Sequence, residues 1–216
     1  MRPQTIIFWD VDTQADFMLP GGNLYVPGAE TTIPNLRRLT DAARQGHVFL
    51  VSDVDVHAPD DPEFQHWPPH CVQGTPGQQK IPETMTECYF VVPNRSGAPL
   101  PADWSPYQQL ILEKQTLDVF DNPNTEAVLE RLGCEPEFIV YGVVTEYCVR
   151  LAARGLLERG RRVALITDAT CALKAEDGLR ALDELCSMGA RLITTDEALR
   201  LVESESHTAV RGHQSS

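Results

Sequence analysis

The sequence has no long hydrophobic run and no surplus of basic residues. Of 216 residues, 18 are Lys or Arg and 31 are Asp or Glu, which gives a formal net charge of −13. Nucleic acids and anionic membranes are bound through clustered Lys and Arg, so this composition argues against both partners. No apolar stretch approaches the ~20 residues of a membrane span, and Met1 to Gln4 do not begin a signal-peptide pattern. We therefore expect a cytoplasmic protein.

Paired cysteine motifs and phosphate-binding loops are missing as well. Six cysteines are scattered along the chain without a C-x-x-C pair, so free thiols are expected rather than a disulfide framework. No G-x-G-x-x-G and no Walker loop follows the first predicted strand, which weighs against a nucleotide-binding protein. The remaining composition, 42% hydrophobic and 23% charged, is typical of a folded globular chain.

Strand-like and helix-like segments alternate along the chain. The predicted strands are Thr5–Val11, His47–Ser52, Gln109–Lys114, Glu137–Tyr141, Arg162–Thr167 and Arg191–Thr194. The predicted helices are Thr31–Gln45, a short one ending at Gly133, Tyr147–Arg159, Lys174–Met188 and Asp196–Val202. Such alternation indicates βαβ units and a parallel sheet covered on both faces. We predict an α/β fold, a three-layer αβα sandwich with a mostly parallel, about six-stranded sheet, in which residues 1–202 form one domain and residues 203–216, which show no periodicity, form a flexible tail.

Reactive side chains stand at the ends of four predicted strands. Asp12 follows the first, Asp55 and His57 follow the second, Lys114 ends the third, and Cys148 comes within one turn of the fourth. Each has an ordinary structural explanation: an Asp that caps a helix, a solvated Lys, a buried Cys. In open α/β sheets, however, ligands bind outside the carboxyl ends of the strands. We therefore expect these side chains to converge on one crevice.

The residue types at these strand ends suit nucleophilic catalysis on an amide. The thiolate is the reactive form of cysteine, and a helix N-terminus and the Lys114 ammonium would both favour it at Cys148. Asp12 is a candidate general base and acid, which takes the thiol proton and returns it to a leaving amine. Backbone N–H groups at the start of the helix could stabilise an oxyanion. This combination predicts an amidase with a thioester intermediate.

A second group of residues suits a metal ion. Asp55 and His57, with His70 in the sequence His-Trp-Pro-Pro-His-Cys, offer a carboxylate and two imidazoles, which are ligands for Zn²⁺, Fe²⁺ or Mn²⁺. His70 belongs to a proline-rich stretch, residues 59–82, that is too long to be a mere connection. The alternative is a surface loop with solvated histidines. Competing ligands in the same loop are Glu63 and His66.

Several segments together carry a family pattern. They are Val11–Phe17 with Pro20–Gly22 and Leu24, Ser52–His57, Trp67–Gly77 (WPPHCVQGTPG), Lys114, and Gly142–Val149 (GVVTEYCV). Trp67–Gly77 is the most specific of them. In these segments the chain resembles the isochorismatase-like cysteine hydrolases, and within that family the nicotinamidases. The resemblance extends over nearly the whole chain, from Ile6 to Leu199.

The resemblance implies a role for each residue of the site. The implied catalytic residues are Asp12, Lys114 and Cys148, and the implied ligands of one divalent metal ion (Zn, Fe or Mn) are Asp55, His57 and His70. The implied oxyanion hole is formed by Val144 and Cys148, next to a cis peptide bond between Val143 and Val144. The implied substrate pocket is lined by Phe17, Trp67 and Tyr147. The implied reaction converts nicotinamide, a small neutral amide, and water to nicotinate and ammonia in NAD salvage, and the family suggests a homo-oligomer.

Three positions depart from the family pattern, and other functions stay open. Glu63 stands where a further histidine is often found, Tyr147 precedes the nucleophile where nicotinamidases often have histidine, and the stretch after Lys114 matches only loosely. Another amidase of the superfamily, acting on a ureide, carbamoyl or maleamate-like compound, is the nearest alternative. A non-catalytic binding protein on the same fold is a further one. Cleavage of isochorismate is less favoured, because that reaction does not need a nucleophilic cysteine.

Overall fold

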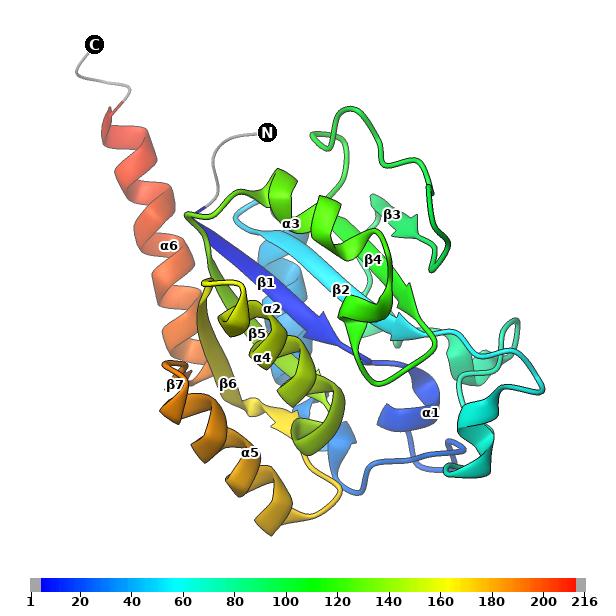
Figure 1. Ribbon diagram of the computed structural model, residues 1–216. Helices are drawn as coiled ribbons and strands as arrows, with labels where there is room; N and C mark the ends of the chain where they lie inside the picture. The colour runs from blue at the N-terminus through cyan, green and yellow to red at the C-terminus, as the bar shows by residue number, and fades with distance from the viewer. Residues whose placement is uncertain (1–4, 213–216) are drawn as a thin grey trace.

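One parallel sheet forms the centre of the molecule. The computed structural model describes residues 5–212, with side chains as far as Ser204. Its strands are β1 (Ile6–Val11), β2 (Phe49–Asp55), β3 (Tyr89–Val92), β4 (Gln109–Lys114), β5 (Glu137–Val143), β6 (Arg162–Cys171) and β7 (Arg191–Ile193). The strand order is β3-β4-β2-β1-β5-β6-β7, and every pairing is parallel (Figure 1). The predicted mostly parallel α/β sheet is confirmed, with seven strands instead of about six.

Helices cover both faces of the sheet (Figure 1). The helices are α1 (Ala15–Met18), α2 (Ile33–Arg44), α3 (Thr125–Leu132), α4 (Arg150–Glu158), α5 (Ala175–Ser187) and α6 (Thr195–Gly212). Helices α2 and α6 pack on one face, and α3, α4 and α5 pack on the other. The sheet therefore has one hydrophobic core on each side, as expected for strands joined by right-handed crossovers.

The apolar pattern of β1 explains why this strand lies at the middle of the sheet. All six of its residues are buried. Ile6 and Phe8 belong to the core beneath α2 and α6, whereas Ile7, Trp9 and Val11 belong to the opposite core. A strand that is apolar on both faces requires cover on both faces, as parallel sheets provide. The carboxyl end of β1 is thereby held at the centre of the sheet edge.

Several sequence predictions about the elements are wrong in part. Strands β2 and β6 end at Asp55 and Cys171, beyond their predicted ends at Ser52 and Thr167, because the pairing with their neighbours continues. Strand β3 was not predicted, because its four residues form an edge strand that is defined by its pairing with β4. Helix α6 was expected to end at Val202, but it continues to Gly212. Most of the predicted aperiodic tail is therefore helical, and residues 213–216 of it lie outside the described residues. Among the helices described, none is both long and apolar enough to cross a membrane.

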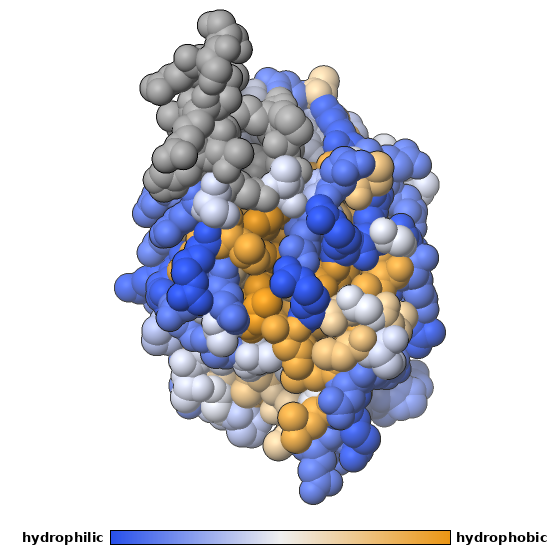
Figure 2. Space-filling model, turned by 90° about the vertical axis from the view of Figure 1, so that its left-hand side faces the viewer, coloured by the Kyte–Doolittle hydropathy of each residue, from blue (hydrophilic) through white to orange (hydrophobic). Residues whose placement is uncertain are grey.

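The edge of the sheet formed by β7 exposes apolar side chains. Figure 2 shows an apolar band on this side of the molecule, framed by hydrophilic residues. Leu192 of β7 is 43% exposed, and Met188 at the end of α5 is 37% exposed. This band lies far from the carboxyl ends of β1, β2 and β4, so it takes no part in the site described next.

Candidate active site

Four central strands bring their reactive residues together, as the sequence predicts. Asp55 and Lys114 are the last residues of β2 and β4 and pair directly in the sheet register. The Lys114 Nζ donates to Asp12 Oδ2 at 2.8 Å and also to Asp55 Oδ1. The same ammonium lies 3.7 Å from Cys148 Sγ. One buried cation therefore contacts the predicted base, the predicted nucleophile and the predicted metal ligand.

The turn that carries Cys148 follows β5. Strand β5 ends at Val143, the peptide bond to Val144 is cis as the resemblance implies, and Thr145–Val149 form a π-helical turn before α4. Cys148 thus lies in this turn, not in the first turn of an α-helix as predicted. The Val144 carbonyl accepts from the Tyr147 and Val149 N–H groups, at 3.1 and 3.2 Å, which closes the turn.

Burial sets the proton affinities in this site. It raises the pKa of the Cys148 thiol well above its ordinary value, and the nearby Lys114 ammonium opposes this shift. Burial also raises the pKa of Asp12, with a further rise from the charge of Asp55 and an opposing effect of Lys114. The sequence predicts that the helix start and Lys114 favour the thiolate at Cys148; desolvation outweighs the effect of Lys114. The Cys148 thiol lies within hydrogen-bond reach of Asp12.

The three predicted metal ligands form one buried cluster. Donor atoms of Asp55, His57 and His70 all lie within 4.8 Å of one another. Asp55 Oδ2 is 3.7 Å from His57 Nε2 and 3.5 Å from His70 Nε2. The competing ligand His66 is exposed and does not belong to this cluster.

The surroundings of the cluster fit a divalent cation. The His70 Nδ1 lies 2.8 Å from the Pro68 carbonyl, so it carries the proton, and the Nε2 lone pair faces the cluster. The His57 Nδ1 lies 3.1 Å from Asp61 Oδ2, an ion-pair distance, and both ring nitrogens of His57 are buried without a hydrogen-bond partner. Histidine ligands of metals are commonly oriented by a carbonyl or carboxylate on the second nitrogen. An imidazole nitrogen buried without a partner is also costly unless a ligand completes it.

Charge balance supports the same conclusion. Asp12 and Asp55 share the single ammonium of Lys114, and all three side chains are at most 2% exposed. Burial raises the pKa of the neighbouring Asp53 to about 7, so this carboxyl adds a negative charge only above that pH. Buried charges require compensation. A divalent cation beside Asp55 would supply this compensation.

Two side chains hold the loops of the site in register. The Gln14 amide donates to the Asp55 carbonyl at 2.7 Å and to the Gln78 carbonyl at 2.6 Å, and its oxygen accepts from the Asp55 N–H. Asp16 accepts from the Cys71 N–H at 2.7 Å, directly after His70. The sequence pattern contained both residues, but it gave no sign of which backbone groups they bind.

The cluster and the nucleophile share one narrow pocket. Its lining includes the predicted Phe17, Trp67, Val144, Tyr147 and Cys148, together with Asp55 and His70. Trp67 and Tyr147 meet edge to face, with ring centroids 5.3 Å apart. The rest of the wall is Leu24, Glu63, Leu117 and Leu173. The three leucines were missed by sequence reasoning; in the loosely matching stretch after Lys114, the wall residue is a leucine and not an aromatic residue.

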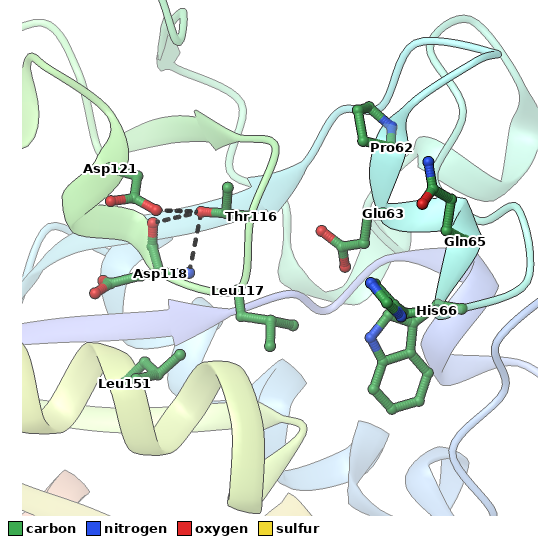
Figure 3. Close-up of a pocket in the computed structure, with 10 residues that line it drawn as sticks. Pro62, Glu63, Gln65, His66, Thr116, Leu117, Asp118, Asp121 and Leu151 are labelled. Atoms are coloured by element: carbon green, nitrogen blue, oxygen red, sulfur yellow. Dashed lines mark hydrogen bonds between the residues drawn. The ribbon is translucent and has the colours of Figure 1, made fainter.

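An open groove of about 520 Å³ adjoins this pocket and shares Glu63, Trp67 and Leu117 with it. Figure 3 shows the groove between the loop that carries Glu63 and His66 and the loop that carries Thr116 and Asp118. Among the residues that the structure describes, no Lys or Arg lines it, whereas Glu63, Asp118 and Asp121 do. The groove is therefore an acidic approach to the pocket.

The sequence matches the isochorismatase domain over residues 6–98 and 90–197. The chain belongs to the isochorismatase family. It is 28% identical over 189 residues to the nicotinamidase/pyrazinamidase of Mycobacterium tuberculosis, an alignment that covers 85% of this chain and 95% of that protein. It is 27% identical over 216 residues to the nicotinamidase of Escherichia coli, with 90% of this chain and 96% of that protein covered.

Solved structures give the same family relationship. The crystal structure of pyrazinamidase of Pyrococcus horikoshii in complex with zinc superposes with a TM-score of 0.70 and 29% sequence identity, covering 88% of this chain and 99% of that one. The nicotinamidase/pyrazinamidase structure from Bacillus subtilis, at 22% identity and a TM-score of 0.72, shares the fold. The family's α/β architecture thus extends over nearly the entire chain.

Proposed function

We propose that this protein is a metal-dependent cysteine amidohydrolase that converts nicotinamide and water to nicotinate and ammonia. Family membership and the nicotinamidase relatives identify the chain as a hydrolase of amide bonds. The single observation that carries the finer proposal is the contact of one buried ammonium, Lys114, with Asp12, Asp55 and Cys148. It joins the machinery for amide cleavage to a metal cluster within one pocket.

The reaction begins with proton transfer within the buried pair. Asp12 accepts the Sγ proton as the Cys148 sulfur attacks the carbonyl carbon of the amide. We assign the oxyanion hole to the N–H groups of Val144 and Cys148, which would donate to the oxygen that becomes negative. Asp12 then gives its proton to the departing nitrogen, so that ammonia leaves and a thioester remains on Cys148. The Lys114 ammonium, 2.8 Å from Asp12 Oδ2, favours the ionised form of this carboxyl against the effect of burial.

Hydrolysis of the thioester uses the same carboxylate again. Asp12 removes a proton from water, the hydroxide oxygen adds to the thioester carbonyl, and the C–S bond breaks. The carboxylic acid is released and the thiol recovers its proton from Asp12. The hydrophobic side chains of the pocket, among them Phe17 and Trp67, hold an aromatic ring beside the nucleophile.

Asp55, His57 and His70 would hold the divalent cation, which we propose to be Zn²⁺, Fe²⁺ or Mn²⁺. When bound, it supplies an electron-pair acceptor for a ring nitrogen of the substrate. Glu63 lines the same pocket, and burial raises the pKa of its carboxyl. A crystal structure with the metal bound would show whether Glu63 or water completes the ligand set.

A comparison of substrates tests this function. Purified protein loaded with each of the three metals is incubated with nicotinamide, maleamate, a ureide and a carbamoyl amino acid, and ammonia is measured. We expect kcat/KM to be highest for nicotinamide. Turnover of one of the other amides at a higher kcat/KM would assign the chain to another amidase group of the superfamily, and no ammonia from any of them would contradict amide hydrolysis.

The wider setting of this function is also proposed. We infer a single domain over residues 1–202 because one sheet with two cores extends from Ile6 to Ile193. A small neutral amide needs neither nucleic acid nor membrane as a partner, and the charge of −13 suits neither. Cytoplasmic location, a role in NAD salvage and a homo-oligomer follow from the family resemblance.

A further inference from the structure

Glu146, two residues before the nucleophile, connects the Cys148 turn to a different helix. Its Oε1 accepts from the backbone N–H of Lys174 at 2.9 Å. Lys174 is the residue that precedes α5, and its own side chain makes no capping hydrogen bond. The contact therefore joins two segments that are 28 residues apart in the chain. The sequence suggested no function for Glu146 beyond its place in the nucleophile segment.

The start of α5 packs directly on this turn. A Cβ built on Gly178 of α5 would be 2.6 Å from the Ala172 Cβ and 3.8 Å from the Thr145 Cβ, so a larger residue would have to displace its neighbours. Leu173, which lies next to Lys174, forms part of the wall of the catalytic pocket. The hydrogen bond of Glu146 thus fixes the turn against a segment that also shapes the pocket.

The second carboxylate oxygen of Glu146, Oε2, is buried and has no hydrogen-bond partner. The position of this side chain therefore has a cost in desolvation free energy. Buried polar atoms without partners are uncommon, and each calls for an explanation. An ordinary surface glutamate would expose this oxygen to solvent. The geometry instead keeps the carboxylate between the turn and α5.

We propose that Glu146 is a positioning residue for the nucleophile: it holds the 144–149 turn against the start of α5 and so maintains the distance between Cys148, Asp12 and Lys114. The effect on turnover rests on the proposed amidase function; the effect on the turn does not. A displacement of about 1 Å at a reacting group can reduce a rate by up to ~10²-fold. Loss of the hydrogen bond is therefore expected to lower kcat more than it changes KM.

The test compares three variants of the full chain. Glu146→Ala removes the acceptor, Glu146→Gln keeps an acceptor oxygen without the charge, and Glu176→Ala removes an exposed acidic residue from the first turn of α5 without touching the nucleophile turn. Hydrogen–deuterium exchange of peptides that cover residues 144–149, thermal unfolding and steady-state kinetics are measured for each. We expect faster exchange in these peptides and a kcat lowered about tenfold in Glu146→Ala, with KM within about twofold. Glu146→Gln and Glu176→Ala should match the wild type.

A lowered melting temperature in Glu146→Ala, with unchanged exchange at 144–149 and unchanged kcat, would show a merely stabilising role and overturn the proposal. Loss of activity in Glu146→Gln as severe as in Glu146→Ala would also overturn it, since the hydrogen-bond acceptor would then be irrelevant. If the wild type proves inactive on nicotinamide, the substrate assignment fails, and the exchange comparison still decides the role of Glu146.

Discussion

At the scale of single residues, Lys114 is the centre of the site. Its ammonium is fully buried and contacts two carboxylates and a thiol. Burial alone would lower its pKa, but the charges of Asp12 and Asp55 outweigh desolvation and raise the pKa well above its usual value. The proposed mechanism accordingly uses Lys114 as a fixed positive charge. It assigns the exchange of protons to Asp12.

Substitution of Asp12 tests this division of roles. Asp12→Asn keeps the size of the side chain but cannot accept the thiol proton, so we expect kcat to fall by about 10²- to 10⁴-fold. Because Asp12 is not a member of the metal cluster, zinc content should stay at the wild-type level. Stopped ammonia assays measure kcat, and metal analysis of the purified variant measures its zinc content. A variant that keeps most of its kcat would exclude Asp12 as the base.

The convergence of the reactive residues was largely predictable from the sequence. Asp12, Asp55, Lys114 and Cys148 stand at or after the ends of strands, and the ends of parallel strands meet at one sheet edge. The net direction of the pKa of Cys148 was not predictable, because it depends on how deeply the turn is buried. The leucine side chains of the pocket also carry no sequence signal, since a wall leucine and a core leucine look alike in a sequence.

At the scale of elements, the close pairing of strands β1 and β5 positions the segment that carries the nucleophile. Gly142 near the end of β5 has φ +115, and a Cβ there would lie 2.1 Å from the Val11 carbonyl oxygen. Val11 and Gly142 are register partners in the two strands. Only glycine allows the strands to approach this closely just before Asp12 and the 144–149 turn.

Gly142→Ala should therefore destabilise the fold strongly. We expect the free energy of unfolding to fall by about 3 kcal/mol or more, because both the backbone conformation and the contact with Val11 are incompatible with a methyl group. Gly160→Ala is the matched control: its φ is also positive, at +70, but the space around it is open, so a loss of about 1 kcal/mol is expected. Urea unfolding of the two variants measures the difference. Equal losses would show that the strand contact is unimportant.

The long loop between β2 and β3 brings His70 to the metal cluster. Zinc at about 100 times its dissociation constant should add about 2.7 kcal/mol of stability, which for a chain of this length raises the melting temperature by roughly 5–10 °C. His70→Ala should abolish this shift, and His66→Ala, an exposed histidine of the same loop, should keep it. Thermal unfolding of both variants with and without zinc measures this shift in melting temperature. An unchanged shift in His70→Ala would remove it from the ligand set.

The elements were predictable where apolar periodicity is strong and not where pairing defines them. Strand Gln109–Lys114 was predicted with its observed bounds, since three of its six residues, Leu110, Ile111 and Leu112, form a compact apolar run. The short edge strand β3 depends on β4 for its hydrogen bonds. The last residues of α6 extend beyond the apolar pattern that marks Ala198 and Val202 as core. The π-helical turn at Cys148 has no signature in the sequence.

At the scale of the whole molecule, the excess of acidic residues includes the groove that leads to the catalytic pocket. The chain has a net charge of −13, and the described residues that line the groove include three carboxylates and neither Lys nor Arg. Like charges repel within a Debye length of about 8–10 Å at physiological ionic strength. Anionic molecules, which include a carboxylate product, should therefore reach the pocket less readily than neutral amides.

Neutralising the groove should change this preference. Asp118→Asn with Asp121→Asn removes two charges from the groove, and the amide oxygens can still accept from the Phe120 N–H and the Thr116 hydroxyl. We expect nicotinate to inhibit about threefold to tenfold more tightly at low salt, with little change at high salt, and KM for nicotinamide to stay the same. Glu130→Gln with Asp183→Asn, two exposed positions outside the groove, is the control. An inhibition constant equal to that of the control would exclude charge selection by the groove.

The most direct test of the central claim is ammonia release from nicotinamide by metal-loaded Cys148→Ala beside the wild type. Zinc content and thermal stability of both proteins are measured on the same preparations. We expect Cys148→Ala to bind as much metal as the wild type and to release ammonia at least about 10⁴-fold more slowly, because the thioester cannot form. A Cys148→Ala protein that binds the metal, is folded and still releases ammonia at a rate close to that of the wild type would contradict nucleophilic catalysis by Cys148.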